Sequence, residues 1–376
     1  MRFGIYIHFP WCRNRCPYCD FAIAVPGKGQ EPPHEAYLAA VLDELAHQAP
    51  LFEGKELVSI YFGGGTPSLW EPDCVGSVIE ACCRRFAARP GDLEISIECN
   101  PGDCNAERFA AWQSVRINRV LVGVQATNEQ DLVVLGRDHR VGDGKSGLAR
   151  TLAAGFDSVG ADVILGVPGS DDALASLLDV AKLAPPHISA YELTIEDRTN
   201  FGRRVRDGDL VPEDEDTLAD LYERCHDELT GRGYEHYEVS SFAKPGHRAV
   251  HNSLYWQGAD YLGLGNGAAS LLCNLDGSAV RWQNARSVKG YLAADPGAHI
   301  ESRDPIEAVD FAAEKLWLAM RTIDGAAKEA LVGLESVVGE LVGQGLLAEE
   351  ADRISPTPKG FLYNNQLISR LGLASR

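Results

Sequence analysis

Short apolar runs alternate with longer amphipathic stretches through the first half of the sequence. The apolar runs, which predict strands, are residues 2–8, 57–62, 93–98, 119–125, 158–165 and 187–193. Apolar residues with helical spacing fill 35–49, 72–88, 106–115, 144–154 and 173–183. This alternation indicates βαβ units and a parallel sheet whose strands are covered on both faces. Repeated crossovers of one hand curl such a sheet, so we predict an α/β fold with a partial parallel (β/α)6 barrel.

Polar residues gather near the carboxyl ends of the predicted strands. In chain order these are Tyr6 and His8, residues 63–66 (Gly-Gly-Gly-Thr), Glu98, Gln125 and Asp162. In a parallel barrel the carboxyl ends of the strands form the mouth where active sites lie. The sequence therefore predicts one polar rim.

Cys12, Cys16 and Cys19 follow the first predicted strand in a C-x3-C-x2-C run. The spacing lets three thiolates reach one metal centre from a single loop. Three interpretations remain open: an iron–sulfur cluster with an open iron, structural zinc completed by His8 or a remote thiol, and incidental thiols. The other seven cysteines show no second metal spacing; Cys99 and Cys104 fall near the predicted barrel mouth, with no role assigned by the sequence.

Length and charge exclude several classes of protein. A chain of 376 residues predicts two or three domains. A net charge of −19 argues against a nucleic-acid surface and a polybasic membrane anchor. The sequence opens without a basic segment followed by an apolar one, and it has no stretch of about 18 apolar residues. We therefore expect a cytoplasmic protein whose ten cysteines are ligands and core thiols.

The cysteine loop resembles that of a known superfamily. Tyr6-x-His8-x-Pro10 followed by Cys12-x3-Cys16-x2-Cys19 is similar to the cluster loop of radical S-adenosylmethionine proteins. Within them it resembles the branch that holds oxygen-independent coproporphyrinogen III oxidase and the heme chaperones. The resemblance implies a 4Fe–4S cluster bound by the three cysteines, with S-adenosylmethionine chelating the open iron.

The same resemblance implies a set of cofactor-binding residues. Residues 63–67 (Gly-Gly-Gly-Thr-Pro) are similar to a family segment that holds the amino end of S-adenosylmethionine, although alone they predict only a turn. The implied binding residues are Tyr6, Tyr18, Gly64, Gly65, Thr66, Glu98, Gln125, Arg137 and Asp162. His8 either joins this set or orients the cluster loop. No catalytic residue is assigned.

A second motif indicates which branch the chain resembles. From its residues alone, His251-Asn252-x-x-Tyr255-Trp256 favours a core element at a strand edge, but it resembles a motif of the heme chaperones. This implies heme with His251 as its ligand, a role that suits a neutral imidazole, and His247 is the rival. Phe21 stands where the oxidases have a fourth cysteine, and only eleven residues precede Cys12.

We therefore predict a heme chaperone that transfers heme to hemoproteins. The alternatives are the oxygen-independent coproporphyrinogen III oxidase and a structural protein whose cysteine loop binds zinc. The predicted domains are a radical SAM core (1–233), a β-containing extension (234–303) and a mostly helical, winged-helix-like module (304–376). Residues 306–376 carry ten acidic and seven basic side chains, so DNA is excluded as a partner. The expected partners are heme and heme-accepting proteins; a homodimer and peripheral membrane association through the targets stay open.

Overall fold

One large curved sheet organises the chain in the computed structural model, which describes residues 1–295 and 297–372. Its strand order is β12-β11-β10-β9-β1-β2-β3-β4-β5-β6-β8-β7, and β1 to β6 are parallel neighbours. These six strands are β1 (Arg2–Phe9), β2 (Glu56–Gly64), β3 (Glu94–Cys99), β4 (Arg119–Gln125), β5 (Ser158–Leu165) and β6 (His187–Glu192). The predicted α/β class and partial parallel barrel are confirmed.

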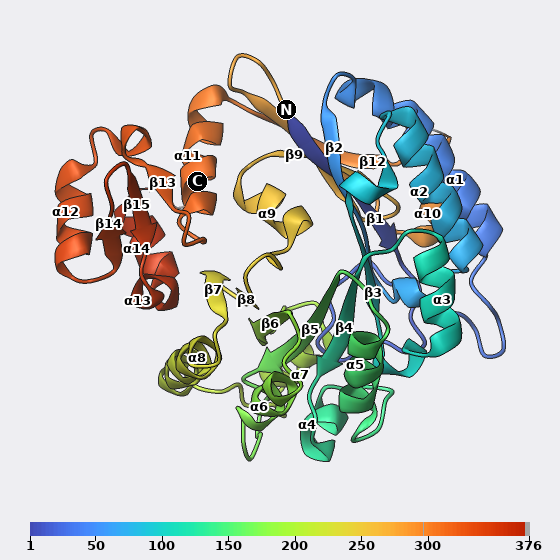
Figure 1. The fold of residues 1–376 in the computed structure, drawn as a ribbon, viewed down its shortest axis with the longest axis horizontal. Helices are drawn as coiled ribbons and strands as arrows, with labels where there is room; N and C mark the ends of the chain where they lie inside the picture. Colours follow the sequence, from blue (N-terminus) through green and yellow to red (C-terminus); the bar gives the residue numbers. More distant parts are fainter. Residues whose placement is uncertain (296, 373–376) are drawn as a thin grey trace.

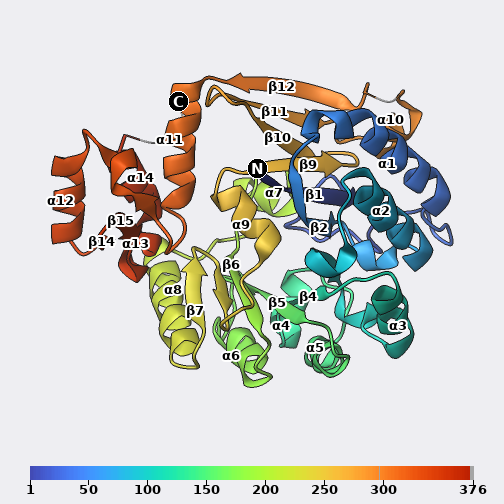
Figure 2. The ribbon, with the colours of Figure 1, turned by 45° about the horizontal axis from the view of Figure 1, so that its top comes forward.

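Helices cover the convex side of this sheet, as Figures 1 and 2 show. They include α1 (His34–Gln48), α2 (Pro72–Arg85), α3 (Ala106–Ser114), α5 (Asp143–Ala153) and α6 (Ala175–Lys182). The short helix α4 (Glu129–Val134) instead follows β4 and packs in a separate cluster with Ile164 and Tyr18. Side chains alternate along each strand. In β1, Ile5 and Ile7 join the apolar core, while Tyr6 and His8 are available to the concave side. The concave side of the sheet thus carries the polar groups.

The predicted extension does not form a sheet of its own. Its strands join both ends of the large sheet: β7 (Glu235–Glu238) and β8 (Ser241–Ala243) follow β6, while β9 (Asp260–Leu264), β10 (Ala269–Cys273), β11 (Ala279–Asn284) and β12 (Ile300–Ile306) follow β1. Helix α10 (Val288–Ala293) packs beside α1. Helix α9 (Val250–Trp256) lies on the concave side of the sheet (Figure 1). The His-Asn-x-x-Tyr-Trp motif is therefore helical, and the expectation of a strand edge is wrong.

Two helices that were not predicted lie between β6 and β7 in the sequence, α7 (Asn200–Arg206) and α8 (Glu215–Thr230). The C-terminal part has its own core and small sheet: α11 (Ala308–Ala319), β13 (Ala326–Ala327), α12 (Glu335–Gly343), β14 (Leu347–Glu349), β15 (Arg353–Pro356), α13 (Pro358–Leu362) and α14 (Asn364–Arg370). It joins the barrel edge through hydrogen bonds from Val239 N to Arg321 O (3.0 Å) and from Ile323 N to Tyr237 O (3.1 Å). Within the described residues, every helix is too short or too polar to span a bilayer.

Candidate cofactor site

The loop that carries the three cysteines is held closed at its base. It leaves β1 after Phe9, and Cys12 N donates to Ala24 O (3.0 Å) while Ala24 N donates to Pro10 O (2.9 Å). The three thiols are free and partly exposed. Burial is the main cause that raises the pKa of Cys12 to about 11; the hydrogen bond from Thr66 opposes it, and the Cys19 and Cys16 thiols add to the increase.

The arrangement of these thiols disfavours structural zinc. Across residues 1–295 and 297–372, no three His, Cys, Asp or Glu side chains converge on a position for one metal ion. Nor is His8 free to complete such a site, since its Nδ1 lies 3.1 Å from Tyr6 Oη and its Nε2 lies 3.2 Å from Ala22 O. Three thiolates from one loop fit an iron–sulfur cluster, in which the cysteines need not share a single ion. His8 instead orients the loop through Ala22.

Side chains from two other segments touch the cysteines. Thr66 Oγ1 donates to Cys12 Sγ (3.4 Å), and Arg137 Nη1 donates to Cys16 Sγ (3.7 Å). Arg137 is fixed by donating to Asn100 Oδ1 (2.7 Å) and Gly123 O (3.2 Å), and its buried Nε lacks a partner. The guanidinium thus places a positive charge beside a sulfur atom that a metal would bind. The structure thus brings two of the predicted cofactor residues to the cluster loop, whereas Asn100 was not predicted.

The glycine turn after β2 packs directly against the cysteine loop. Gly64 has a φ of +109°, and a Cβ on Gly65 would lie 2.7 Å from the backbone C and O atoms of Pro10. Gly65 N donates to Phe9 O (2.8 Å), and Thr66 N donates to Trp11 O (2.9 Å). Glycine is required here because the two backbones approach so closely.

Two partly buried carboxylates face the space beside this turn. Glu98 accepts hydrogen bonds from Tyr61 Oη (2.7 Å) and Gly64 N (3.2 Å), whereas Asp162 Oδ1 has no partner. Burial is the main cause that raises the pKa of Glu98 to about 7 and that of Asp162 to about 6, and the charge of Asp162 contributes to the increase at Glu98. An unsatisfied buried acceptor indicates a missing donor, and a cationic or hydroxylated ligand supplies one.

The remaining predicted residues occupy the same rim. Gln125 adopts a φ of +63° where the pairing of β4 with β5 shifts register. Tyr18 lies beside Arg137 and Cys16, since both affect its ionisation. Tyr6 stacks on Tyr61 with ring centroids 6.0 Å apart. Tyr61 was missed because a tyrosine in an apolar strand is typical of a core residue.

Comparison with known proteins agrees with this geometry. The family model "Radical SAM superfamily" matches residues 6–181. Over 376 residues the chain is 36% identical to "Heme chaperone HemW" of Escherichia coli (strain K12), covering 97% of each chain. It is 33% identical to "Heme chaperone HemW" of Mycobacterium tuberculosis (strain ATCC 25618 / H37Rv), covering 98% of this chain and 94% of that protein. The chain belongs to the HemW family of radical SAM proteins.

A solved structure supports the fold of this HemW family member. The chain superimposes on coproporphyrinogen III oxidase (HemN) from Escherichia coli with a TM-score of 0.79 and 23% identity, covering 98% of this chain and 89% of the oxidase. At that identity the likeness shows the fold alone. Membership of the radical SAM superfamily implies a 4Fe–4S cluster and S-adenosylmethionine, and the cysteine loop and the polar rim described above fit both.

His251, the predicted heme ligand, lies in the barrel interior close to this site. Its Nδ1 is 2.9 Å from Ser59 Oγ, its Nε2 is 2.9 Å from Tyr255 Oη, and its ring stacks on Tyr61 at 5.0 Å. Burial lowers its pKa to about 3, so the imidazole is neutral. Because Tyr61 also binds Glu98, the two predicted sites share a side chain. His247, the rival ligand, is instead placed at the start of β5 beside Ser158 (3.2 Å).

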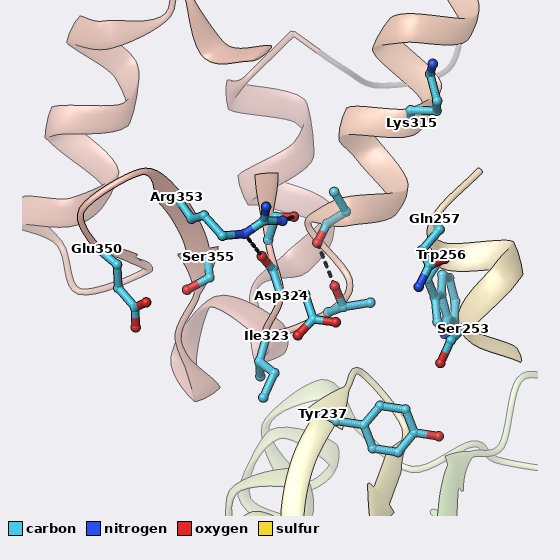
Figure 3. Close-up of a pocket in the computed structure, with 13 residues that line it drawn as sticks. Tyr237, Ser253, Trp256, Gln257, Lys315, Ile323, Asp324, Glu350, Arg353 and Ser355 are labelled. Atoms are coloured by element: carbon cyan, nitrogen blue, oxygen red, sulfur yellow. Dashed lines mark hydrogen bonds between the residues drawn. The ribbon is translucent and has the colours of Figure 1, made fainter. Parts of the chain in front are cut away.

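The opposite side of α9 borders a cavity of about 630 Å³, shown in Figure 3. Ser253 and Trp256 of α9 line it together with Gln257, which follows the helix, while Lys315 and Arg353 line it from the C-terminal module. The buried Nε1 of Trp256 has no hydrogen-bond partner. The motif is thus divided between two spaces, with His251 facing the barrel and Trp256 facing the cavity.

Proposed function

We propose that this chain binds heme and transfers it to hemoprotein targets, with the cluster and S-adenosylmethionine held at the barrel mouth. The observation that carries the proposal is similarity along nearly the whole chain to proteins named heme chaperone. Two features of this sequence support it. Phe21 is exposed where the oxidases have a cysteine, and α9 carries the His-Asn-x-x-Tyr-Trp motif.

We assign His251 Nε2 as the nitrogen that binds heme iron. The imidazole is neutral, as an axial ligand must be. Its Nδ1 faces Ser59, which is fully buried in β2, whereas its Nε2 faces Tyr255, which is only partly buried. Binding at Nε2 therefore requires that the Tyr255 hydroxyl be displaced.

The test is a heme titration of three variants followed through the Soret band. His251→Ala should lose the ligand-dependent Soret maximum. Tyr255→Phe keeps the ring but removes the competing hydrogen bond, which contributes about 0.5–1.5 kcal/mol, so it should bind heme about two- to tenfold more tightly. His247→Ala is the matched control and should behave as the wild type.

Two results would overturn parts of this proposal. Unchanged heme binding by His251→Ala would place the ligand elsewhere, and the cavity beside Trp256 would become the next site to examine. Decarboxylation of coproporphyrinogen by the anaerobically prepared protein would instead identify an oxidase.

We further propose that the chain acts in the cytoplasm and that its protein partners are hemoproteins that accept heme. On this view it reaches membranes only through such targets. We retain the division into residues 1–233, 234–303 and 304–376, with the last part closing the cavity next to α9. Light scattering of the purified protein distinguishes a monomer from a homodimer.

A further inference from the structure

Two cysteines that the cofactor site does not use lie in contact with each other. Cys99 ends β3, and Cys104 follows the short 3-10 turn Pro101–Asp103. Their sulfur atoms are 3.5 Å apart, and both side chains are almost fully buried. A disulfide has an S–S distance of about 2.05 Å, so the sulfur atoms must approach by about 1.5 Å. Both thiols are free in this structure.

The surroundings make the two sulfur atoms chemically different. The hydrogen bond between the two sulfur atoms lowers the pKa of Cys104, although burial opposes this. The Thr151 hydroxyl and the Arg150 guanidinium, whose Nε donates to Cys104 O (2.7 Å), lower this pKa further. The same hydrogen bond and burial raise the pKa of Cys99. By contrast, burial raises the pKa of Cys225, which has no such neighbours, to about 12. Cys104 is therefore the nucleophile of the pair, and Cys99 is the resolving thiol.

The turn between the two cysteines lies close to the protein surface. Gly102 and Asn105 are exposed, and a Cβ on Gly102 would meet no atom within 4 Å. Asp103 and Asn100 from this segment reach toward the cysteine loop through Arg13 (2.6 Å) and Arg137 (2.7 Å). The buried pair therefore lies next to two exposed residues, and a change in the turn reaches the cluster loop through two contacts.

We infer that Cys99 and Cys104 form a redox-active dithiol that takes a small hydroperoxide as its oxidant. The Cys104 thiolate attacks one peroxide oxygen: the S–O bond forms, the O–O bond breaks, and the leaving hydroxide or alkoxide takes a proton. Cys99 then attacks the Cys104 sulfenic acid: the S–S bond forms, the S–O bond breaks, and water leaves. The peroxide gains two electrons and the pair loses two, and a dithiol reductant reverses the reaction by exchange.

A tryptic digest separates this pair from every other cysteine. Trypsin does not cut between Arg89 and Pro90, so residues 86–108 form one peptide that contains Cys99 and Cys104 and no other cysteine. The cluster-loaded protein is treated with hydrogen peroxide, denatured and alkylated with iodoacetamide. We expect this peptide to carry no label and to be two hydrogen atoms lighter than the reduced peptide. If dithiothreitol is added before alkylation, both cysteines should be labelled. The peptide 56–84, with Cys74, Cys82 and Cys83, is the matched control and should stay labelled.

A second measurement orders the two steps. In Cys99→Ser the sulfenic acid has no resolving thiol, so dimedone should trap it on Cys104; in Cys104→Ser dimedone should leave Cys99 unmodified. The inference is overturned if the wild-type peptide stays doubly labelled under peroxide, or if it gains oxygen atoms without losing hydrogen. Trapping on Cys99 alone would reverse the assigned roles and contradict the mechanism. The wild-type measurement holds even if a serine variant folds poorly.

Discussion

Glu98 is the side chain whose protonation should set the affinity for S-adenosylmethionine. Burial raises its pKa to about 7, against the opposing hydrogen bond from Tyr61, and the Asp162 carboxylate adds to the increase. S-adenosylmethionine carries a sulfonium and an ammonium group, and an ionised Glu98 carboxylate would attract either one. As the pH falls through 7, Glu98 takes up a proton and this attraction is lost.

The magnitude follows from that pKa. With a value of about 7, the protonated fraction should reduce affinity about tenfold between pH 8 and pH 6, or about 1.4 kcal/mol. Glu98→Gln keeps an acceptor for Tyr61 but removes the charge, so it should bind more weakly at pH 8. Its affinity should also lack this pH dependence. The ratio of wild-type to variant affinity cancels the titration of the cofactor's own amino group.

Anaerobic equilibrium dialysis of the cluster-loaded proteins at pH 6, 7 and 8 measures this ratio. Iron content should be the same in both proteins, because Glu98 makes no hydrogen bond to a cysteine. Glu238→Gln is the control: its carboxyl is also buried with a pKa of about 7, but it lies in β7 at the sheet edge. A ratio that stays constant across this pH range would refute the placement of Glu98 against the cationic part of the cofactor.

Three further predictions concern the loop and the core. Cys12→Ala removes one of three cluster ligands and should abolish iron and sulfide uptake on reconstitution, whereas Cys225→Ala should not. Gly65→Ala places a Cβ against the Pro10 backbone and should lower cluster content, whereas Gly102→Ala meets open space and should leave it unchanged. Burial raises the pKa of Glu44 from 4.5 to about 7, so its contribution to stability is present below pH 4.5 and lost as the pH rises through 7. Between pH 5 and pH 8, the free energy of unfolding in urea should therefore fall by about 2–3 kcal/mol more in the wild type than in Glu44→Gln.

The barrel was predictable because its signals are local. Strands covered on both faces are apolar along their length, and the predicted runs 119–125 and 158–165 coincide with β4 and β5. The cysteine loop was predictable for the same reason, since all its ligands fall within eight residues. A parallel sheet then brings the strand ends together without further information.

Contacts between distant segments could not be predicted. Helix α9 has seven residues, and the carboxylate of Glu94 in β3 accepts from the N–H groups of Val250 (3.1 Å) and His251 (2.9 Å) at its first turn. Those N–H groups normally need a capping side chain from nearby sequence, which is missing here. A cap that comes from more than 150 residues away leaves no local signal. The motif therefore favoured a strand edge when its residues were considered alone.

The position of α9 connects the two halves of the proposed function. Its first turn is tied to Glu94, which also pairs with the buried Arg119 (3.5 Å) at the base of the barrel. Its last turn presents Trp256 to the cavity that the C-terminal module closes. A ligand in that cavity therefore contacts the same short helix that places His251 against Tyr61. Tyr61 in turn donates to Glu98. The helix that borders the cavity is therefore connected to the cofactor rim through His251, Tyr61 and Glu98.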